Sequence, residues 1–158
     1  MTERLPEPHV LVVRGGVERG DQRGRTIGFP TANLPIERDG LLDGVWAGWV
    51  DCRGRRHAAA ISIGHRPTFY GRDGFRLLEA HLLDFDEDIY DEVVDVWLCQ
   101  RLRGQRRFAG VAELTAQLAA DVAATRAWVA ADSQHAPLAH DALVTVPLGV
   151  AVPVARSA

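Results

Sequence analysis

Apolar and β-branched residues come in short stretches along the first two thirds of the chain, and turn-forming residues separate these stretches. This pattern predicts β-strands. The expected strands cover Val10–Val17, Val45–Val50, His57–Ile63, Arg76–Leu83 and Glu92–Leu102. About five or six strands joined by short turns, with no helix between them, are typical of an antiparallel barrel. We therefore expect a mostly β fold.

The segments between these strands carry glycine, proline and charged residues. They predict loops at 19–28, 35–43 and 67–74, and Arg53-Gly54 marks a tight turn. The acidic segment Asp84–Asp91 connects the two longest strands and lacks the ligand spacing of a calcium-binding EF-hand loop. We interpret it as a solvated turn.

A helical pattern occurs from about Val111 to Ala130, where apolar residues recur with helical spacing. We expect this apolar stripe to close one side of the barrel. It consists of Val111, Leu114, Leu118, Val122 and Val129.

These patterns predict one domain at residues 10–130, an N-terminal arm at 1–9 and a C-terminal tail at 131–158. Within the tail, Leu143–Val146 is a candidate edge strand.

Composition narrows the function classes. The chain has 158 residues and a net charge of −3, which argues against nucleic acid as the main partner. All 18 basic residues are arginine, so a P-loop lysine and a Schiff-base lysine are excluded. No apolar run reaches the length of about 18 residues that a membrane span needs. Two cysteines without metal-ligand spacing indicate buried reduced thiols in a cytoplasmic protein. We also expect a monomer.

The segment Arg23–Leu34 carries the strongest chemical pattern. Its glycines allow backbone N–H groups to approach an anion closely, and its arginines add positive charge. Thr31 and Asn33 share one face of an extended segment and offer hard neutral oxygens that suit Mg²⁺. A phosphate cradle beside a metal face is what a nucleotide-using phosphotransferase needs. The alternative for Thr31 and Asn33 is a structural turn after Pro30.

This segment resembles the signature of riboflavin kinases. Further segments resemble the same family in order and at its spacing, over roughly residues 10–130. They are Gly44–Ala47, Ser62–Phe69, Leu78–Tyr90, and Leu102-Arg103 followed by Phe108. The chain departs from the family at Asp91, where the family usually has glycine.

The resemblance implies a small antiparallel Greek-key barrel with one C-terminal helix packed on it. It implies transfer of phosphate from ATP to the ribityl 5′-hydroxyl of riboflavin, with Mg²⁺, giving FMN and ADP. Thr31 and Asn33 would then bind the metal and ATP, and Glu79 would be the catalytic base. Further nucleotide-binding candidates are Gly20, Arg23, Gly24, Arg25 and Thr26. Arg103 and Phe108 would touch the flavin from a flap at residues 103–108.

Several alternatives stay open. Glu79 would otherwise face solvent or pair with an arginine, and His81, two residues further, is expected to be a hydrogen-bonded scaffold residue. Phe108 would otherwise be a hydrophobic staple for the following helix. The whole chain would otherwise be a non-catalytic flavin- or nucleotide-binding regulatory module, or a kinase for a flavin analogue. We also expect a single-domain form, without the adenylyltransferase half to which bacterial members are often fused.

Overall fold

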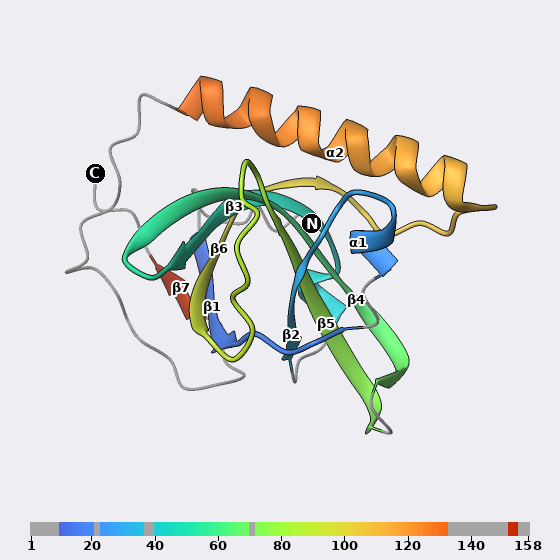
Figure 1. The fold of residues 1–158 in the computed structure, drawn as a ribbon, viewed down its shortest axis with the longest axis horizontal. Coiled ribbons are helices and arrows are strands. Elements are labelled where there is room, and N and C mark those ends of the chain that lie inside the picture. Colours follow the sequence, from blue (N-terminus) through green and yellow to red (C-terminus); the bar gives the residue numbers. More distant parts are fainter. Residues whose placement is uncertain (1–9, 21–22, 37–39, 70–71, 133–151, 155–158) are drawn as a thin grey trace, which may run out of the picture.

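The strands form one antiparallel sheet that curls into a nearly closed barrel (Figure 1). The computed structural model describes residues 10–20, 23–36, 40–69, 72–132 and 152–154. The sheet order is β2-β5-β4-β3-β6-β1-β7. The strands are β1 Val10–Gly16, β2 Ala32–Ile36, β3 Gly44–Cys52, β4 Arg55–Phe69, β5 Arg72–Leu82, β6 Val93–Arg103 and β7 Val152–Val154. The expected antiparallel barrel is confirmed.

Backbone hydrogen bonds just after β1 bring the two sides of the barrel together. The Glu18 N–H donates to the Asn33 carbonyl of β2 at 2.8 Å, and the two residues form an isolated β-bridge. The neighbouring Val17 N–H donates to the Glu92 carbonyl, also at 2.8 Å. The bond to Asn33 connects the edge strand β2 to the β1 side and places Asn33 at the seam, and the bond to Glu92 continues the pairing of β1 with the β6 side.

The core lies inside the barrel and consists of the inward side chains of alternating strand positions. In β5 these are Leu78, Ala80 and Leu82, which belong to one buried cluster with Ile61 of β4 and Leu34 of β2. Burial of this apolar area stabilises the folded state by about 25 cal/mol per Å². Because successive side chains of a strand point to opposite faces, the intervening residues of β5, including Glu79, project from the outer face.

Two loop predictions were only partly right. Residues 67–69 and 72–74 continue the β4–β5 ladder, so most of the expected loop is strand, and Figure 1 shows this hairpin projecting beyond the barrel. This extension is defined by backbone pairing of β4 with β5, which the pattern of apolar residues does not indicate. Similarly, β2 extends to Ile36, because an edge strand with one neighbour tolerates Pro35.

Two short helical turns interrupt the other expected loops. A single turn, α1 (Arg23–Thr26), lies within the glycine- and arginine-rich segment, and η1 (Gly40–Leu42) precedes β3. The predicted turn at Arg53-Gly54 is confirmed: both residues have positive φ, 51° and 74°, as a tight hairpin between right-twisted strands requires.

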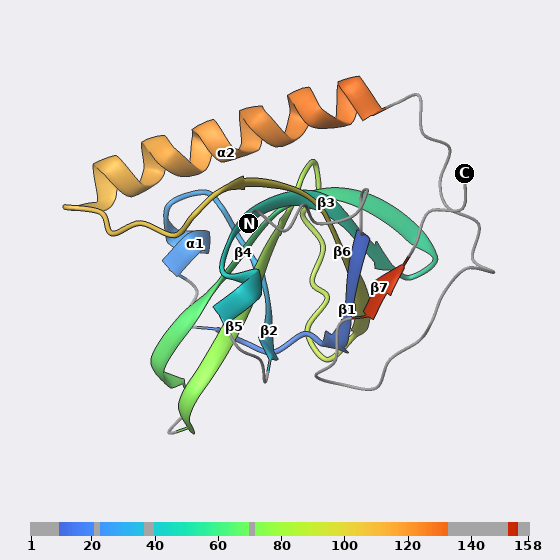
Figure 2. The same ribbon diagram turned by 180° about the vertical axis from the view of Figure 1, so that it is seen from behind.

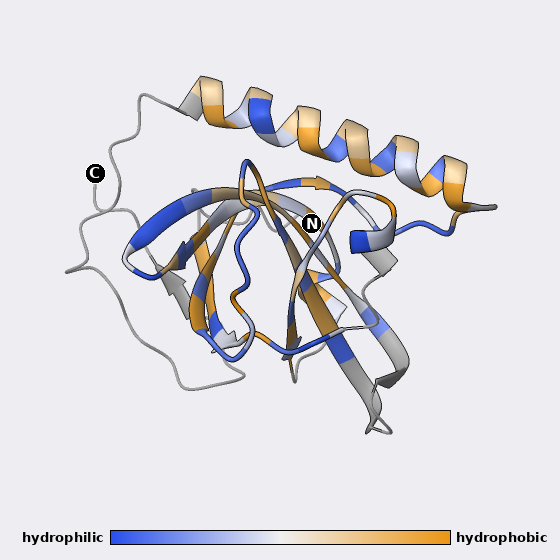
Figure 3. Cartoon of the chain, viewed as in Figure 1, coloured by the Kyte–Doolittle hydropathy of each residue, from blue (hydrophilic) through white to orange (hydrophobic). Residues whose placement is uncertain are grey.

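The long helix α2 spans Val111–Asp132 and crosses one side of the barrel, over β3, β4 and β6 (Figures 1 and 2). The predicted apolar stripe was wrong at its first position, because Val111 is 64% exposed. Hydrophilic and hydrophobic positions alternate along α2 in Figure 3, and the helix instead buries the polar residues Asp121 and Thr125. Near its C-terminal end, Trp128 packs against Trp49 of β3 with ring centroids 5.6 Å apart.

A short strand of the C-terminal region completes the sheet. β7 pairs with β1, with Val10 opposite Val154 and Val12 opposite Val152; Figure 2 shows the two strands side by side. The candidate edge strand Leu143–Val146 lies outside the described residues. Among the described residues, no helix has the length and apolar character needed to cross a membrane.

Candidate active site

A row of polar residues crosses three strands on the outer face of the barrel. Asn33 of β2 lies directly opposite Glu79 of β5, and Glu79 lies directly opposite Ser62 of β4. Directly opposite residues in antiparallel strands have Cβ atoms about 4.5–5.5 Å apart and point to the same face. The structure thus brings together the predicted metal ligand Asn33 and the predicted base Glu79, and it adds Ser62.

Asn33 is buried, with 5% of its surface exposed, and its carboxamide packs onto Gly20. A Cβ at position 20 would lie 2.4 Å from Asn33 Nδ2, so only glycine leaves room for this carboxamide. Within the described part of the chain, no side-chain hydrogen bond of Asn33 occurs. A buried polar group usually has a hydrogen-bond partner, so this carboxamide has the character of a ligand-binding group.

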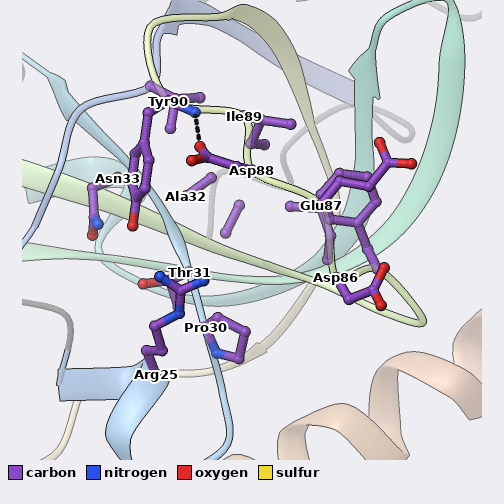
Figure 4. Close-up of a pocket in the computed structure, with 14 residues that line it drawn as sticks. Arg25, Pro30, Thr31, Ala32, Asn33, Asp86, Glu87, Asp88, Ile89 and Tyr90 are labelled. Carbon is purple, nitrogen blue, oxygen red and sulfur yellow. Dashed lines mark hydrogen bonds between the residues drawn. The ribbon is translucent and has the colours of Figure 1, made fainter.

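Thr31 and Arg25 line the pocket next to Asn33 (Figure 4). Three residues of the acidic connection, Asp86, Glu87 and Asp88, line the same pocket. Positive and negative groups therefore face one pocket, as a site for a metal–phosphate complex requires.

The remaining candidates of the first loop are distributed along one stretch of backbone. Arg23, Gly24, Arg25 and Thr26 form the turn α1, and the side chains of Arg25 and Thr26 are exposed. The side chain of Arg23 lies outside the described part of the structure. Gly28 follows with φ of 90°, a conformation that favours glycine.

His81 contacts the backbone that leads into β2. Its Nδ1 lies 2.8 Å from the Pro30 carbonyl, and its ring meets Phe29 edge to face with centroids 5.5 Å apart. This is the scaffold role expected from the sequence. It fixes the backbone just before Thr31.

The acidic connection between β5 and β6 is tied down by two arginines. Arg53, from the β3–β4 turn, donates to Glu92 at 2.7 Å, to Glu87 at 3.1 Å and to the Asp88 carbonyl at 2.9 Å. Arg126 of α2 donates to both oxygens of Asp84, and this hydrogen bonding lowers the pKa of the Asp84 carboxyl. The pocket wall is thus an anchored segment.

Tyr90 lies at the end of this segment and lines the pocket beside Asn33 (Figure 4). The Arg19 guanidinium sits over its ring, 4.3 Å from the centroid. The next residue, Asp91, has φ of 65°. The conformation at the position where the family usually has glycine is therefore the left-handed one.

The second predicted loop leaves β6 at Arg103 and enters α2. Arg103 donates to both carboxylate oxygens of Asp121, at 2.9 and 2.7 Å, and Asp121 is buried beneath α2. The Phe108 ring is half-buried, with the Arg106 and Arg103 guanidinium groups 5.0 and 5.9 Å from its centroid. Arg103 is therefore fixed to the helix, and its guanidinium contributes one side of the Phe108 environment.

Glu113 stabilises the junction between this loop and α2. Its carboxylate accepts a hydrogen bond from the Ala109 N–H at 3.0 Å and pairs with Arg106. The backbone hydrogen bond from Ala109 lowers the pKa of the Glu113 carboxyl. A carboxylate in the first helical turn also interacts favourably with the helix dipole.

Comparison with known families decides what this site belongs to. The model of the flavokinase family, described as riboflavin kinase, matches residues 7–129. The chain belongs to the riboflavin kinase family.

Relatives within this family are similar along most of the chain. A bifunctional riboflavin kinase/FMN adenylyltransferase of Pseudomonas fluorescens is 43% identical over 124 residues, which cover 78% of this chain and 39% of the relative. An RNA-binding riboflavin kinase, RibR, of Bacillus subtilis is 35% identical over 113 residues, which cover 72% of this chain and 49% of that protein. The chain thus matches less than half the length of these relatives.

The fold is also that of a riboflavin kinase. The crystal structure of riboflavin kinase from Trypanosoma brucei superimposes with a TM-score of 0.63 at 23% identity, and the match covers 93% of this chain and 98% of that one. This agreement extends beyond the resembled motifs to the barrel and α2.

Sequence reasoning missed two residues that the geometry brings to the candidate site or to the loop beside it. Tyr90 was noted only as the neighbour of Asp91, and Asp121 was hidden among the polar positions of α2. A signal for Asp121 existed: it lies one position before Val122, an apolar residue of the predicted stripe. A carboxylate at that boundary requires a partner when the helix packs.

Proposed function

We propose that this chain is a riboflavin kinase, which transfers the γ-phosphoryl group of ATP to the ribityl 5′-hydroxyl of riboflavin and yields FMN and ADP. The observation that carries the proposal is the pairing of Asn33 with Glu79 across β2 and β5, within a chain of the riboflavin kinase family. The proposed metal ligand and the proposed base thus lie on adjacent strands and point to the same face of the sheet.

Glu79 is the proposed base. It is half-buried on the outer face of β5 and flanked by the buried Leu78 and Ala80. In this position its carboxylate accepts the proton of the ribityl hydroxyl as the hydroxyl oxygen attacks the γ-phosphorus and the bond to ADP breaks. Such general-base assistance typically contributes about 10²- to 10⁴-fold.

Thr31 and Asn33 are the proposed ligands of Mg²⁺. A hydroxyl and a carboxamide oxygen are hard neutral donors, and the carboxamide is buried without a side-chain hydrogen bond in the described part of the chain. They fit a metal whose remaining ligands are water and the ATP phosphates. When bound, Mg²⁺ neutralises the charge that develops on the phosphates.

The nucleotide phosphates are proposed to lie along the first loop. Gly20 makes room for Asn33, and Arg25 reaches the same pocket from α1. Arg23, Gly24 and Thr26 belong to the same turn and are proposed to contact the phosphates through backbone N–H groups and charge. No lysine is available for this purpose in the sequence.

Riboflavin is proposed to lie against the loop at residues 103–108. Phe108 offers a half-buried aromatic ring for stacking, and Arg103, held by Asp121, offers a planar guanidinium beside it. The expected absence of a nucleic-acid partner and the monomeric state stay predictions.

The test is incubation of the protein with ATP, Mg²⁺ and riboflavin, followed by chromatographic separation of riboflavin and FMN. We expect FMN and ADP in equal amounts. A regulatory binding module would bind flavin or nucleotide without forming FMN. A kinase for a flavin analogue would phosphorylate that analogue with a higher kcat/KM than riboflavin, which a competition between the two substrates measures.

A further inference from the structure

The side chain of Gln105 turns back from the loop between β6 and α2 and contacts β4. Its Nε2 donates to Ser62 Oγ at 2.9 Å and to the Ile63 carbonyl at 2.7 Å, and it lies 3.5 Å from the Gly44 carbonyl. A carboxamide NH₂ has two hydrogens. The two short bonds therefore use its full donor capacity.

Gly64 provides the space for this side chain. A Cβ at position 64 would lie 3.1 Å from Gln105 Nε2 and 3.3 Å from its Cδ. The φ of Gly64 lies outside the positive region that L side chains rarely adopt, so the close packing of Gln105, and not backbone conformation, favours glycine here. Ser62, the Ile63 carbonyl and Gly64 together form a receptor for Gln105, which we call the Gln105 seat.

The Gln105 seat adjoins the proposed base. Ser62 lies directly opposite Glu79, so Gln105 is bonded to the immediate neighbour of Glu79 on the outer face. On its other side, the loop is bonded to α2 through Arg103 and Asp121. The loop that carries Phe108 is thus anchored both on the sheet, through Gln105, and on the helix.

We propose that Gln105 is a positioning residue: by docking in the seat formed by Ser62, Ile63 and Gly64, it sets the place of Phe108 relative to Glu79 and thereby the flavin subsite. This inference rests on the proposed function. It also gives the segment Ser62–Gly64 a role that its resemblance to a family motif alone does not provide.

The kinetic test compares Gln105→Ala, Ser62→Ala and Ser62→Thr in the full chain. Gln105→Ala is expected to raise the riboflavin KM about tenfold, because two hydrogen bonds are lost. Ser62→Ala, which removes one bond, is expected to raise it about threefold, and Ser62→Thr, which keeps the hydroxyl, to stay close to wild type. The KM for ATP should change less than about twofold, since the phosphate side is untouched.

Two controls sharpen this result. Gln100→Ala makes the same substitution at an exposed glutamine of β6 whose side chain donates to the adjacent Arg101 carbonyl, and it should leave both KM values unchanged. The double variant Ser62→Ala/Gln105→Ala should have the same riboflavin KM as Gln105→Ala within about twofold, because Gln105→Ala alone already removes the contact with Ser62. An unchanged riboflavin KM in Gln105→Ala would overturn the proposal. A lowered one would do so as well, since Gln105 would then block the subsite.

Limited trypsin digestion tests the docking of Gln105 in its seat without relying on enzyme activity. Trypsin cleaves after arginine, and Arg106 and Arg107 directly follow Gln105 on the exposed loop. Gln105→Ala should accelerate cleavage at these two sites several-fold, whereas Gln100→Ala should not. Unchanged cleavage would overturn the seat. If wild-type protein makes no FMN but cleavage accelerates, the proposed function and the positioning role fail, while the Gln105 seat stands.

Discussion

Asn33 of β2 and Glu79 of β5 lie directly opposite each other on the outer face of the barrel, and Asn33 also lines the pocket. The relationship depends on register, because a shift of one residue would turn one of the two side chains into the core. The buried neighbours Leu34 and Leu78, which are also opposite each other, fix that register from the inner face. Packing of the core therefore determines the geometry of the proposed reaction.

Glu79→Gln keeps the shape of the side chain and removes its basicity. We expect turnover to fall about 10²-fold or more, as for other general bases, with riboflavin still bound. Steady-state FMN formation and flavin fluorescence titration measure the two quantities. Glu18→Gln is the matched control, because the exposed Glu18 contributes its backbone and not its side chain to the bridge with Asn33. Near wild-type turnover of Glu79→Gln would remove Glu79 from the chemistry.

Asn33→Ala removes the proposed metal ligand. We expect kcat/KM for Mg·ATP to fall about tenfold or more, and riboflavin affinity to stay nearly unchanged. The melting temperature should stay close to wild type, since the carboxamide makes no side-chain hydrogen bond in the described part of the structure. Equal losses for ATP and riboflavin would instead indicate a general folding defect.

Gly20→Ala tests the contact behind Asn33. The new Cβ would lie 2.4 Å from Asn33 Nδ2, so the carboxamide must move. We expect a loss in kcat/KM for Mg·ATP similar to that of Asn33→Ala, and no further loss when the two changes are combined, because both act on one group. Gly16→Ala is the control, since a Cβ there meets no atom within 4 Å. Additive losses in the double variant would separate Gly20 from Asn33.

The sequence predicted the barrel, the long helix and the strand that carries Glu79, because each depends on local signals, but it did not predict the strand β2 that carries Asn33. Strands with buried apolar faces and turns such as Arg53-Gly54 can be predicted without knowledge of tertiary contacts. The resembled motifs also identified Asn33 and Glu79. Their direct opposition was not predictable, since it depends on the pairing of β2 with β5, strands far apart in the sequence.

What the sequence did not predict depends on tertiary contacts of polar residues. Asp121 is buried only because Arg103 reaches it, and the Gln105 contacts need both β4 and the loop before α2. The exposure of Val111 has the same origin: the helix begins beyond the edge of the sheet, so its first apolar residue has no surface to cover. Periodicity identifies a stripe and not its extent.

Asp91→Gly tests the one departure from the family pattern. Asp91 has φ of 65°, a conformation that costs roughly 1–2 kcal/mol for most L residues and less for aspartate. We expect Asp91→Gly to stabilise the protein by about 0.5 kcal/mol, since relief of strain exceeds the entropy that glycine adds to the unfolded chain. Asp91→Ala should destabilise it. Urea unfolding measures both, and a more stable alanine variant would contradict the assigned conformation.

Phe108→Ala decides between two roles for the aromatic ring. If Phe108 stacks on the flavin, the riboflavin KM should rise far more than the KM for ATP, because the stack contributes about 0.5–1.5 kcal/mol beyond simple burial. If the ring only secures the start of α2, the melting temperature should fall while both KM values stay near wild type. The ring is half-buried and contacts the Arg103 and Arg106 guanidinium groups, so its loss also removes two cation–π contacts. Both KM values and the melting temperature are therefore measured on the same preparation. An unchanged riboflavin KM would exclude Phe108 from the flavin subsite even if the variant were less stable.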